Sequence, residues 1–144
     1  MMYFWGLFRK LAFYKNKEEV SSGEPVSVVI CARNEYFNLK NHLPLLFDQD
    51  YPEFEIVVVN DNSQDESLEL LEDLARDHKN LKIVNLNQDL NFFSGKKFPL
   101  SLGIKSASND IILLTDADCY PTSDQWIKNM AGKFRGDKDI VLGY

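Results

Sequence analysis

The stretch DIILLTDADCYP, residues 110–121, joins a short apolar run to a pair of acids. The run from Ile111 to Leu114 has the composition of a parallel strand that is fully buried. Asp116 and Asp118 follow it with one residue between them, so their side chains point to the same side of an extended segment. Two carboxylates this close repel each other, and a hard divalent cation would relieve the repulsion. The alternative is a loop with two solvated or capping aspartates, because short acidic motifs are weak evidence.

Strand-like and helix-like segments alternate along the rest of the chain. Apolar runs predict strands at 26–31, 55–60 and 81–86, and a further strand at 140–142. Helical spacing of apolar residues predicts the helices between them, with Leu39, Leu43 and Leu46 in the first, Leu68, Leu71 and Leu74 in the second, Leu100 and Ile104 in the third, and Trp126, Ile127, Met130 and Phe134 in the last. This alternation predicts an α/β fold, an open and mostly parallel sheet with helices on both faces.

Polar residues next to two of these strands predict where the following helices begin. Asn34 can cap the first helix. Ser63 and Glu66 have the spacing of a capping box for the second helix.

The predicted topology brings three polar loops to one edge of the sheet. If the 111–114 strand lies beside the first strand, the strand order reverses there, and a crevice opens between 32–35 and 116–118. Asp61, at the end of the second strand, would line the same crevice. This convergence favours a binding site over separate solvated loops.

Four motifs in this order resemble family 2 glycosyltransferases: VSVVICARNE at 26–35, EIVVVNDNSQD at 55–65, Gly95-Lys96, and LTDAD at 114–118. The resemblance covers roughly residues 25–144 and implies the Rossmann-like, nucleotide-sugar-binding half of a GT-A fold. One departure is Asn60, which stands where many relatives have the first of two consecutive acids.

The resemblance also implies roles for individual residues. Asp116 and Asp118 would be the DxD motif, with Asp118 and Asp116 at a Mg²⁺ or Mn²⁺ ion. Asp61 would bind the base, and Glu35 and Asp116 the nucleoside. Lys96 would lie near the diphosphate. The strand-end loop made by Ala32, Arg33 and Asn34 completes the implied nucleotide-sugar site. Structural alternatives remain for Glu35 as a helix-start acid and for Asp61 as a turn residue.

Composition limits the other functions that the chain could have. The formal net charge of −6 argues against general nucleic-acid binding, which requires a basic face. Cys31 and Cys119 have no CxxC or zinc-like spacing, so reduced thiols in the cytosol are the simplest interpretation.

Residues 1–24 are predicted to form a separate arm and linker before the domain predicted at 25–144. The first fourteen residues, MMYFWGLFRKLAFY, are rich in aromatics and are followed by Lys15 and Lys17. They are too few to span a bilayer, which takes roughly 20 apolar residues. They favour an interfacial helix or the end of a membrane helix at the cytoplasmic face of the cell membrane, with packing against protein as the alternative.

The resemblance implies a second half that this sequence does not show. Family members carry an acceptor-binding segment with a general base, and without a base an incoming hydroxyl has no proton acceptor. The sequence therefore predicts a donor-binding fragment of an enzyme whose acceptor is a lipid-linked, polysaccharide or other glycan. The alternatives are a non-catalytic sugar-nucleotide-binding module and a phosphatase with a DxD nucleophile. That phosphatase family would place its motif on the first strand.

Overall fold

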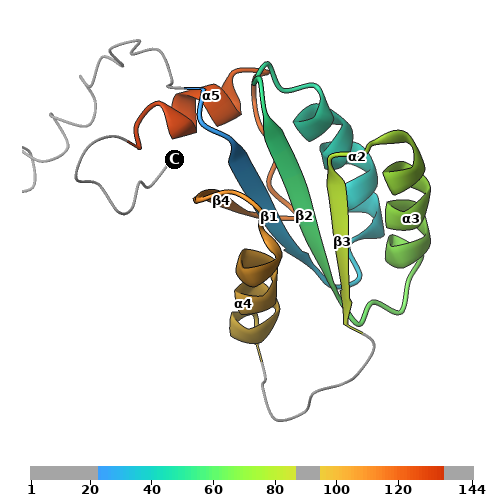
Figure 1. The fold of residues 1–144 in the computed structure, drawn as a ribbon. Coiled ribbons are helices and arrows are strands. Elements are labelled where there is room, and N and C mark those ends of the chain that lie inside the picture. Colours follow the sequence, from blue (N-terminus) through green and yellow to red (C-terminus); the bar gives the residue numbers. More distant parts are fainter. Residues whose placement is uncertain (1–22, 87–94, 135–144) are drawn as a thin grey trace, which may run out of the picture.

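The computed structural model describes residues 23–86 and 95–134 (Figure 1). Residues 1–22 of the arm and linker predicted at 1–24, and the strand predicted at 140–142, lie outside these residues. The elements in chain order are β1 (Val26–Ala32), α2 (Tyr36–Phe47), β2 (Phe54–Asp61), α3 (Ser67–Asp77), β3 (Leu81–Leu86), α4 (Lys97–Ser106), β4 (Ile111–Asp116) and α5 (Trp126–Ala131). Within this part of the chain, no helix is both long and apolar enough to cross a bilayer.

The four strands form one parallel sheet in the order β3-β2-β1-β4. β1 therefore lies between β2 and β4, and the order reverses between β1 and β4 as predicted. In the register, Cys31 pairs with Val59 on one side and with Asp116 on the other. The predicted α/β fold with a parallel sheet is confirmed.

Helices cover both faces of the sheet because alternate strand residues point to opposite sides. On one face, Val28 and Ile30 belong to the main core, together with buried side chains of α2 and α5. These side chains are Leu39, Leu43, Leu46 and Ile127. On the other face, Val29 and Val59 lie against α4 (Figure 1).

Helix α4 packs on the sheet through its smallest residue. A Cβ atom on Gly103 would lie 2.6 Å from Val29 Cγ1 and 2.8 Å from Val59 Cγ2. The helix therefore buries Pro99 and Gly103, whereas Ile104 remains 38% exposed. The apolar spacing of Leu100 and Ile104 did not indicate this packing, because a glycine contact leaves no hydrophobic signal in the sequence.

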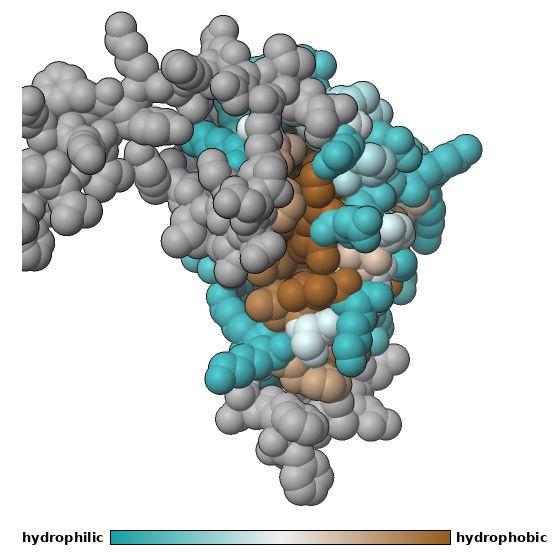
Figure 2. All heavy atoms as spheres, turned by 60° about the vertical axis from the view of Figure 1, so that its left-hand side comes forward, coloured by the Kyte–Doolittle hydropathy of each residue, from teal (hydrophilic) through white to brown (hydrophobic). Residues whose placement is uncertain are grey.

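Strand β4 is only half buried, so the prediction of a fully buried strand is wrong. Ile111 and Leu113 are in the core, but Leu114 on the opposite face is 51% exposed. The reason is the position of α4, which packs over β1, β2 and β3, while β4 is the last strand of the described sheet. Figure 2, which brings the β4 side of the molecule forward, shows a band of hydrophobic surface between hydrophilic flanks.

Candidate functional site

The strands β1, β2 and β4 end at the same edge of the sheet. Ala32 pairs with Asn60, and Cys31 pairs with Asp116. The loops that follow these strands, 33–35, 62–66 and 117–125, therefore begin side by side. The predicted convergence of three polar loops is present in the structure.

A reciprocal pair of hydrogen bonds joins the loops after β1 and β2. The Asn34 N–H donates to Ser63 Oγ at 3.0 Å, and the Gln64 N–H donates to Asn34 Oδ1 at 2.7 Å. Asn34 and Asn62 have φ values of 57° and 51°, in the left-handed region that asparagine tolerates better than most residues. Since the Asn34 side chain binds the other loop, the prediction that it caps the first helix is wrong.

The start of α2 is held by side chains of the second loop instead. The Glu35 N–H donates to Ser67 Oγ and the Tyr36 N–H donates to Asp65 Oδ2, each at 3.1 Å. Asp65 Oδ1 accepts the Ser67 N–H, also at 3.1 Å. One carboxylate thus serves the N-terminal ends of α2 and α3, where unpaired N–H groups need acceptors.

These contacts correct the predicted capping box. Helix α3 begins at Ser67, and its N-cap residue Glu66 makes no side-chain cap hydrogen bond. Ser63 accepts from Asn34 and is not used at the helix. Desolvation by itself would raise the pKa of Asp65, but hydrogen bonds from Ser67 and Tyr36 outweigh it and lower that pKa.

Three charged side chains lie where β1 and β2 end: Arg33, Glu35 and Asp61. Arg33 Nη1 lies 3.9 Å from Asp61 Oδ2, and the Asp61 side chain is 30% exposed. Glu35 Oε2 accepts a hydrogen bond of 2.6 Å from Asn38 Nδ2, which fixes the carboxylate against the first turn of α2. The structure therefore brings Asp61 and Arg33 together. The carboxylates of Asp61 and Glu35 can each accept further hydrogen bonds.

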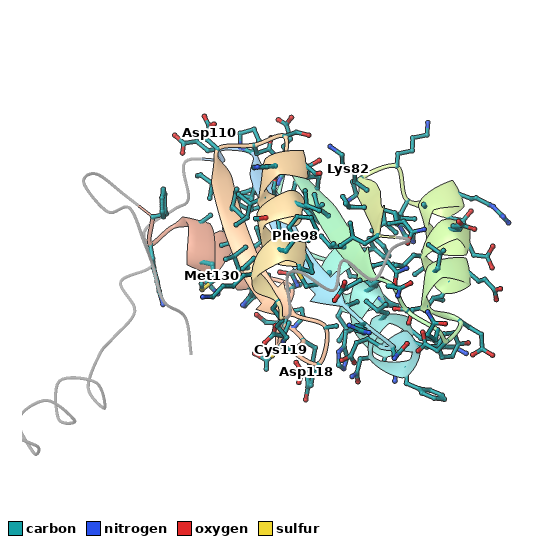
Figure 3. The ribbon with its side chains drawn as sticks, turned by 90° about the horizontal axis from the view of Figure 1, so that it is seen from below. Lys82, Phe98, Asp110, Asp118, Cys119 and Met130 are labelled. Carbon is teal, nitrogen blue, oxygen red and sulfur yellow. The ribbon has the colours of Figure 1, made fainter. Side chains whose placement is uncertain are left out.

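The acidic motif forms a turn beyond β4. The Cys119 N–H donates to the Asp116 carbonyl at 3.1 Å and closes the turn. Seen from below, Asp118 and Cys119 project from this turn (Figure 3). Lys96 Nζ lies 3.0 Å from Asp116 Oδ1, and this hydrogen bond and the nearby acids raise the pKa of Lys96. Two of the predicted site residues, which are 20 positions apart in the sequence, are thus in contact.

A cavity of about 200 Å³ opens beside the Lys96–Asp116 pair. Its lining combines charged and apolar side chains: Cys31, Lys96, Leu100, Leu114, Thr115 and Asp116. A mostly apolar wall with a few convergent polar groups is typical of small-molecule sites. Burial, followed by the negative charge of Asp61 and then that of Asp116, outweighs the opposing charge of Lys96 and raises the pKa of the Cys31 thiol, so this thiol is neutral at physiological pH.

The carboxylates fit a metal ion that is shared with a ligand. In the described part of the chain, no three or more His, Cys, Asp or Glu residues gather to hold a metal on their own. Mg²⁺-type ions are commonly bound by one or two carboxylates together with substrate phosphates. Asp116 and Asp118, exposed on one turn, supply that number of hard oxygen ligands.

Contacts of His42, in α2, and of Gln49, just after it, with the segment that follows β4 were not foreseen from the sequence. His42 Nδ1 lies 2.9 Å from the Ala117 carbonyl oxygen, between the two acids of the motif. Gln49 Nε2 donates to the Ser123 carbonyl at 2.8 Å, and Gln49 Oε1 accepts the Ile127 N–H at 3.0 Å. These pairs are 74 to 78 residues apart, so no local pattern could reveal them.

Known proteins provide an independent comparison. The chain is 33% identical over 108 residues to the poly-β-1,6-N-acetyl-D-glucosamine synthase of Staphylococcus epidermidis, covering 75% of this chain and 25% of that protein. It is 35% identical over 119 residues to an uncharacterized glycosyltransferase of Synechocystis, covering 81% of this chain and 36% of that protein. The chain thus spans about a quarter to two fifths of the length of the relatives it matches.

Solved structures show the same fold. The S. aureus TarS fragment 1–349 in complex with UDP-GlcNAc superposes with a TM-score of 0.65 at 31% identity, over 74% of this chain and 30% of that one. The mannosyltransferase PcManGT of Pyrobaculum calidifontis, in complex with GDP-Man and Mn²⁺, superposes with a TM-score of 0.78 at 24% identity, over 94% of this chain and 40% of that one.

One known family matches the sheet and the site. "Glycosyl transferase family 2" matches residues 27–144, which include the four strands except Val26, and both acids of the motif. This match supports a transferase over the phosphatase alternative, whose motif would lie on the first strand, not on β4. The chain belongs to glycosyl transferase family 2.

Proposed function

We propose that residues 25–144 bind the nucleotide-diphospho-sugar donor of a glycosyltransferase. The observation that carries the proposal is the contact of Lys96 with Asp116 beside a cavity at the carboxyl ends of β1 and β4, where the strand order reverses. Open α/β sheets bind ligands at such a switch point, outside the carboxyl ends of their strands. Membership of the family supports the same assignment, and the TarS relative is described with UDP-GlcNAc.

The positions of the polar groups suggest how the donor lies. Asp61, whose carboxylate is partly exposed beside Arg33, would accept hydrogen bonds from the base. Glu35 and Asp116 flank the nucleoside between β1 and β4, next to the loop formed by Ala32, Arg33 and Asn34. Lys96 would place its ammonium group on the diphosphate, because it already lies at the rim of the cavity.

Asp118 and Asp116 would hold Mg²⁺ or Mn²⁺ together with the diphosphate oxygens. When bound, this ion acts as a Lewis acid that stabilises the departing diphosphate. The side chains of this chain would bind and orient the donor. Transfer to a glycan or lipid-linked acceptor also requires a base for the incoming hydroxyl, and we propose that a further segment of the enzyme supplies it.

We also infer that residues 1–24 hold the protein at the cytoplasmic face of the cell membrane. The support is the aromatic sequence MMYFWGLFRKLAFY followed by Lys15 and Lys17. Soluble nucleotide sugars would there meet a lipid-linked or growing polysaccharide acceptor. No nucleic-acid partner is proposed, given the net charge of −6.

Calorimetry with UDP and GDP, with and without Mn²⁺, tests the donor site. We expect one of the two nucleotides to bind more tightly with metal than with chelator, and Asp118→Ala to abolish that difference. Asp77→Ala, on the exposed end of α3, is the matched control for loss of one carboxylate. Equal affinity with metal and with chelator in the wild type would contradict the metal-assisted site.

Asp61→Ala tests the assignment of the base pocket. We expect weaker binding of the nucleoside monophosphate and an unchanged melting temperature, since the starts of α2 and α3 are held by Asp65 and Ser67, not by Asp61. A collapse of the melting temperature would instead make Asp61 a structural turn residue.

A further inference from the structure

His42, in α2, contacts Ala117, the middle residue of the acidic motif. The His42 Nδ1 atom lies 2.9 Å from the carbonyl oxygen of Ala117. Because a carbonyl oxygen only accepts hydrogen bonds, this contact requires the proton on Nδ1. The imidazole also packs on the ring of Tyr120, with a centroid distance of 5.0 Å and an interplanar angle of 36°. One side chain thus contacts the turn at two points.

The contacted residue has a special place in the motif. Ala117 separates Asp116 from Asp118, and it is 5% exposed, whereas both acids are exposed. The Asp118 carboxylate accepts a weak, local hydrogen bond of 3.6 Å from Cys119 Sγ and interacts with Lys96 through its charge alone. The direction of Asp118 is therefore set mainly by the backbone of the turn.

Electrostatic repulsion makes this backbone control necessary. The two carboxylates repel each other, and without a fixed turn they would separate into solvent. The bond from Cys119 N–H to the Asp116 carbonyl closes the turn locally, but it does not fix the turn relative to the rest of the domain. The burial of Ala117 in the core and the His42 bond both do; the bond orients the Ala117 carbonyl, because α2 is itself fixed to the core through Leu39, Leu43 and Leu46.

We propose that His42 is a positioning residue that holds the Ala117 carbonyl so that Asp116 and Asp118 converge on one divalent cation. This inference rests on the proposed donor site. Groups that hold metal ligands in place typically affect metal affinity by roughly 10–100-fold. Gln49 binds the segment after the turn at Ser123 and Ile127, so loss of the His42 bond leaves that segment attached.

The amide nitrogens of asparagine and glutamine mimic different nitrogens of imidazole. Variants of His42 can therefore separate its hydrogen bond to Ala117 from its ring contact with Tyr120. In His42→Asn the amide nitrogen occupies the place of Nδ1 and can donate to Ala117. In His42→Gln the amide nitrogen falls near the place of Nε2 and misses that carbonyl. His42→Phe keeps a ring against Tyr120 and removes the donor. His78→Asn changes the other histidine of the chain, which stacks on Phe47, and serves as the matched control.

Amide hydrogen exchange measured by NMR on the full chain tests the structural step without a metal. Exchange of the Cys119 amide, which donates to Asp116, should accelerate by roughly five- to tenfold in His42→Phe and His42→Gln. It should stay near the wild-type rate in His42→Asn and His78→Asn. Unchanged exchange in both His42→Phe and His42→Gln, in folded protein, would overturn the proposal.

Titration with Mn²⁺ alone, followed by electron paramagnetic resonance, tests the functional step. The affinity should fall by roughly 10-fold or more in His42→Phe and His42→Gln, and His42→Asn should restore most of it. Wild-type affinity in all variants would overturn the positioning role. A wild-type chain without metal-dependent nucleotide binding would contradict the proposed function instead, and the exchange rates would still decide whether His42 holds the turn.

Discussion

The ammonium group of Lys96 lies 3.0 Å from Asp116 Oδ1, although Lys96 immediately precedes α4, Asp116 ends β4, and the two residues are 20 positions apart. Both side chains are more than half exposed, so water screens this pair. The contact nevertheless places a cation on the oxygen that the proposed metal ion would use. In the proposed donor site, Lys96 would therefore have two opposed effects, repulsion of a bare metal ion and attraction of a diphosphate.

Lys96→Met should separate these two effects. Without nucleotide, Mn²⁺ should bind up to about fivefold more tightly, since an exposed pair of this kind contributes roughly 0.2–1 kcal/mol. UDP or GDP should bind roughly 10–100-fold more weakly, since the variant loses a hydrogen bond to a charged group. Calorimetry measures both affinities, and Lys97→Met, which removes the adjacent exposed cation, is the control. Two affinities that change in the same direction would contradict this dual role.

Asp65 should make the stability of the domain depend on pH. Its two oxygens accept from Tyr36 N–H and Ser67 N–H, and its pKa in the folded state lies below the ordinary value of 3.8. The stabilisation is therefore complete above about pH 4 and is lost as the pH falls through the folded-state pKa. Asp65→Asn keeps one acceptor oxygen and should lower the free energy of unfolding by about 1 kcal/mol at neutral pH.

Urea unfolding at pH 7 and at successively lower pH tests this dependence. The difference between wild type and Asp65→Asn should shrink below pH 4 and vanish once the wild-type carboxyl is protonated. Glu72→Gln, on the exposed side of α3, controls for the loss of one negative charge. A constant difference across the series would show that Asp65 stabilises the loops by packing and not as an ionised acceptor.

The main features of the sheet could be predicted because each depends on a short stretch of sequence. Apolar runs marked β1, β2 and β4, and the rule that parallel strands end at one edge brought Asp61 and Asp116 together. The contacts of Asn34 with Ser63 and of His42 with Ala117 were not predictable in this way. The first contact joins two loops, and the second joins a helix to a loop. The local sequence was equally consistent with Asn34 and Ser63 as helix caps.

The burial of side chains was predicted less well than the position of the strands and helices, because burial also depends on contacts between distant parts of the chain. An apolar run has the same sequence whether it lies in the middle of a sheet or at its edge, so Leu114 gave no sign of its 51% exposure. The packing of α4 depends on the space left by Val29 and Val59, which only the three-dimensional arrangement defines.

Gly103 should tolerate no side chain. In Gly103→Ala the new methyl group would meet Val29 Cγ1 at 2.6 Å and Val59 Cγ2 at 2.8 Å, both on rigid strands. Overpacking of this kind costs about 1–3 kcal/mol, which exceeds or cancels the gain of about 1 kcal/mol that alanine brings to a helix. Urea unfolding should therefore show lower stability for Gly103→Ala, whereas Lys105→Ala on the exposed side of α4 should stay near the wild type. A more stable Gly103→Ala protein would mean that α4 has room to move outward.

The N-terminal arm should bind membranes through both its aromatic residues and its cations. Each large apolar side chain placed in the interface, such as Trp5 or Phe8, contributes about 1.5–3 kcal/mol at best. Each cation near an anionic leaflet, such as Lys15, adds about 1 kcal/mol. The sum is sufficient for a peripheral anchor, so the chain should float with anionic liposomes, and a chain without residues 1–15 should not.

Two further variants separate the contributions to that binding. Trp5→Ser combined with Phe8→Ser should reduce flotation on neutral and anionic vesicles alike, because it removes apolar area. Lys15→Ala combined with Lys17→Ala should reduce it on anionic vesicles only, and more strongly at low ionic strength, because surface charge is screened within about 10 Å at 0.1 M salt. Flotation that does not depend on residues 1–15, or that is absent with them, would make the arm a protein-packing element and remove the support for a membrane location.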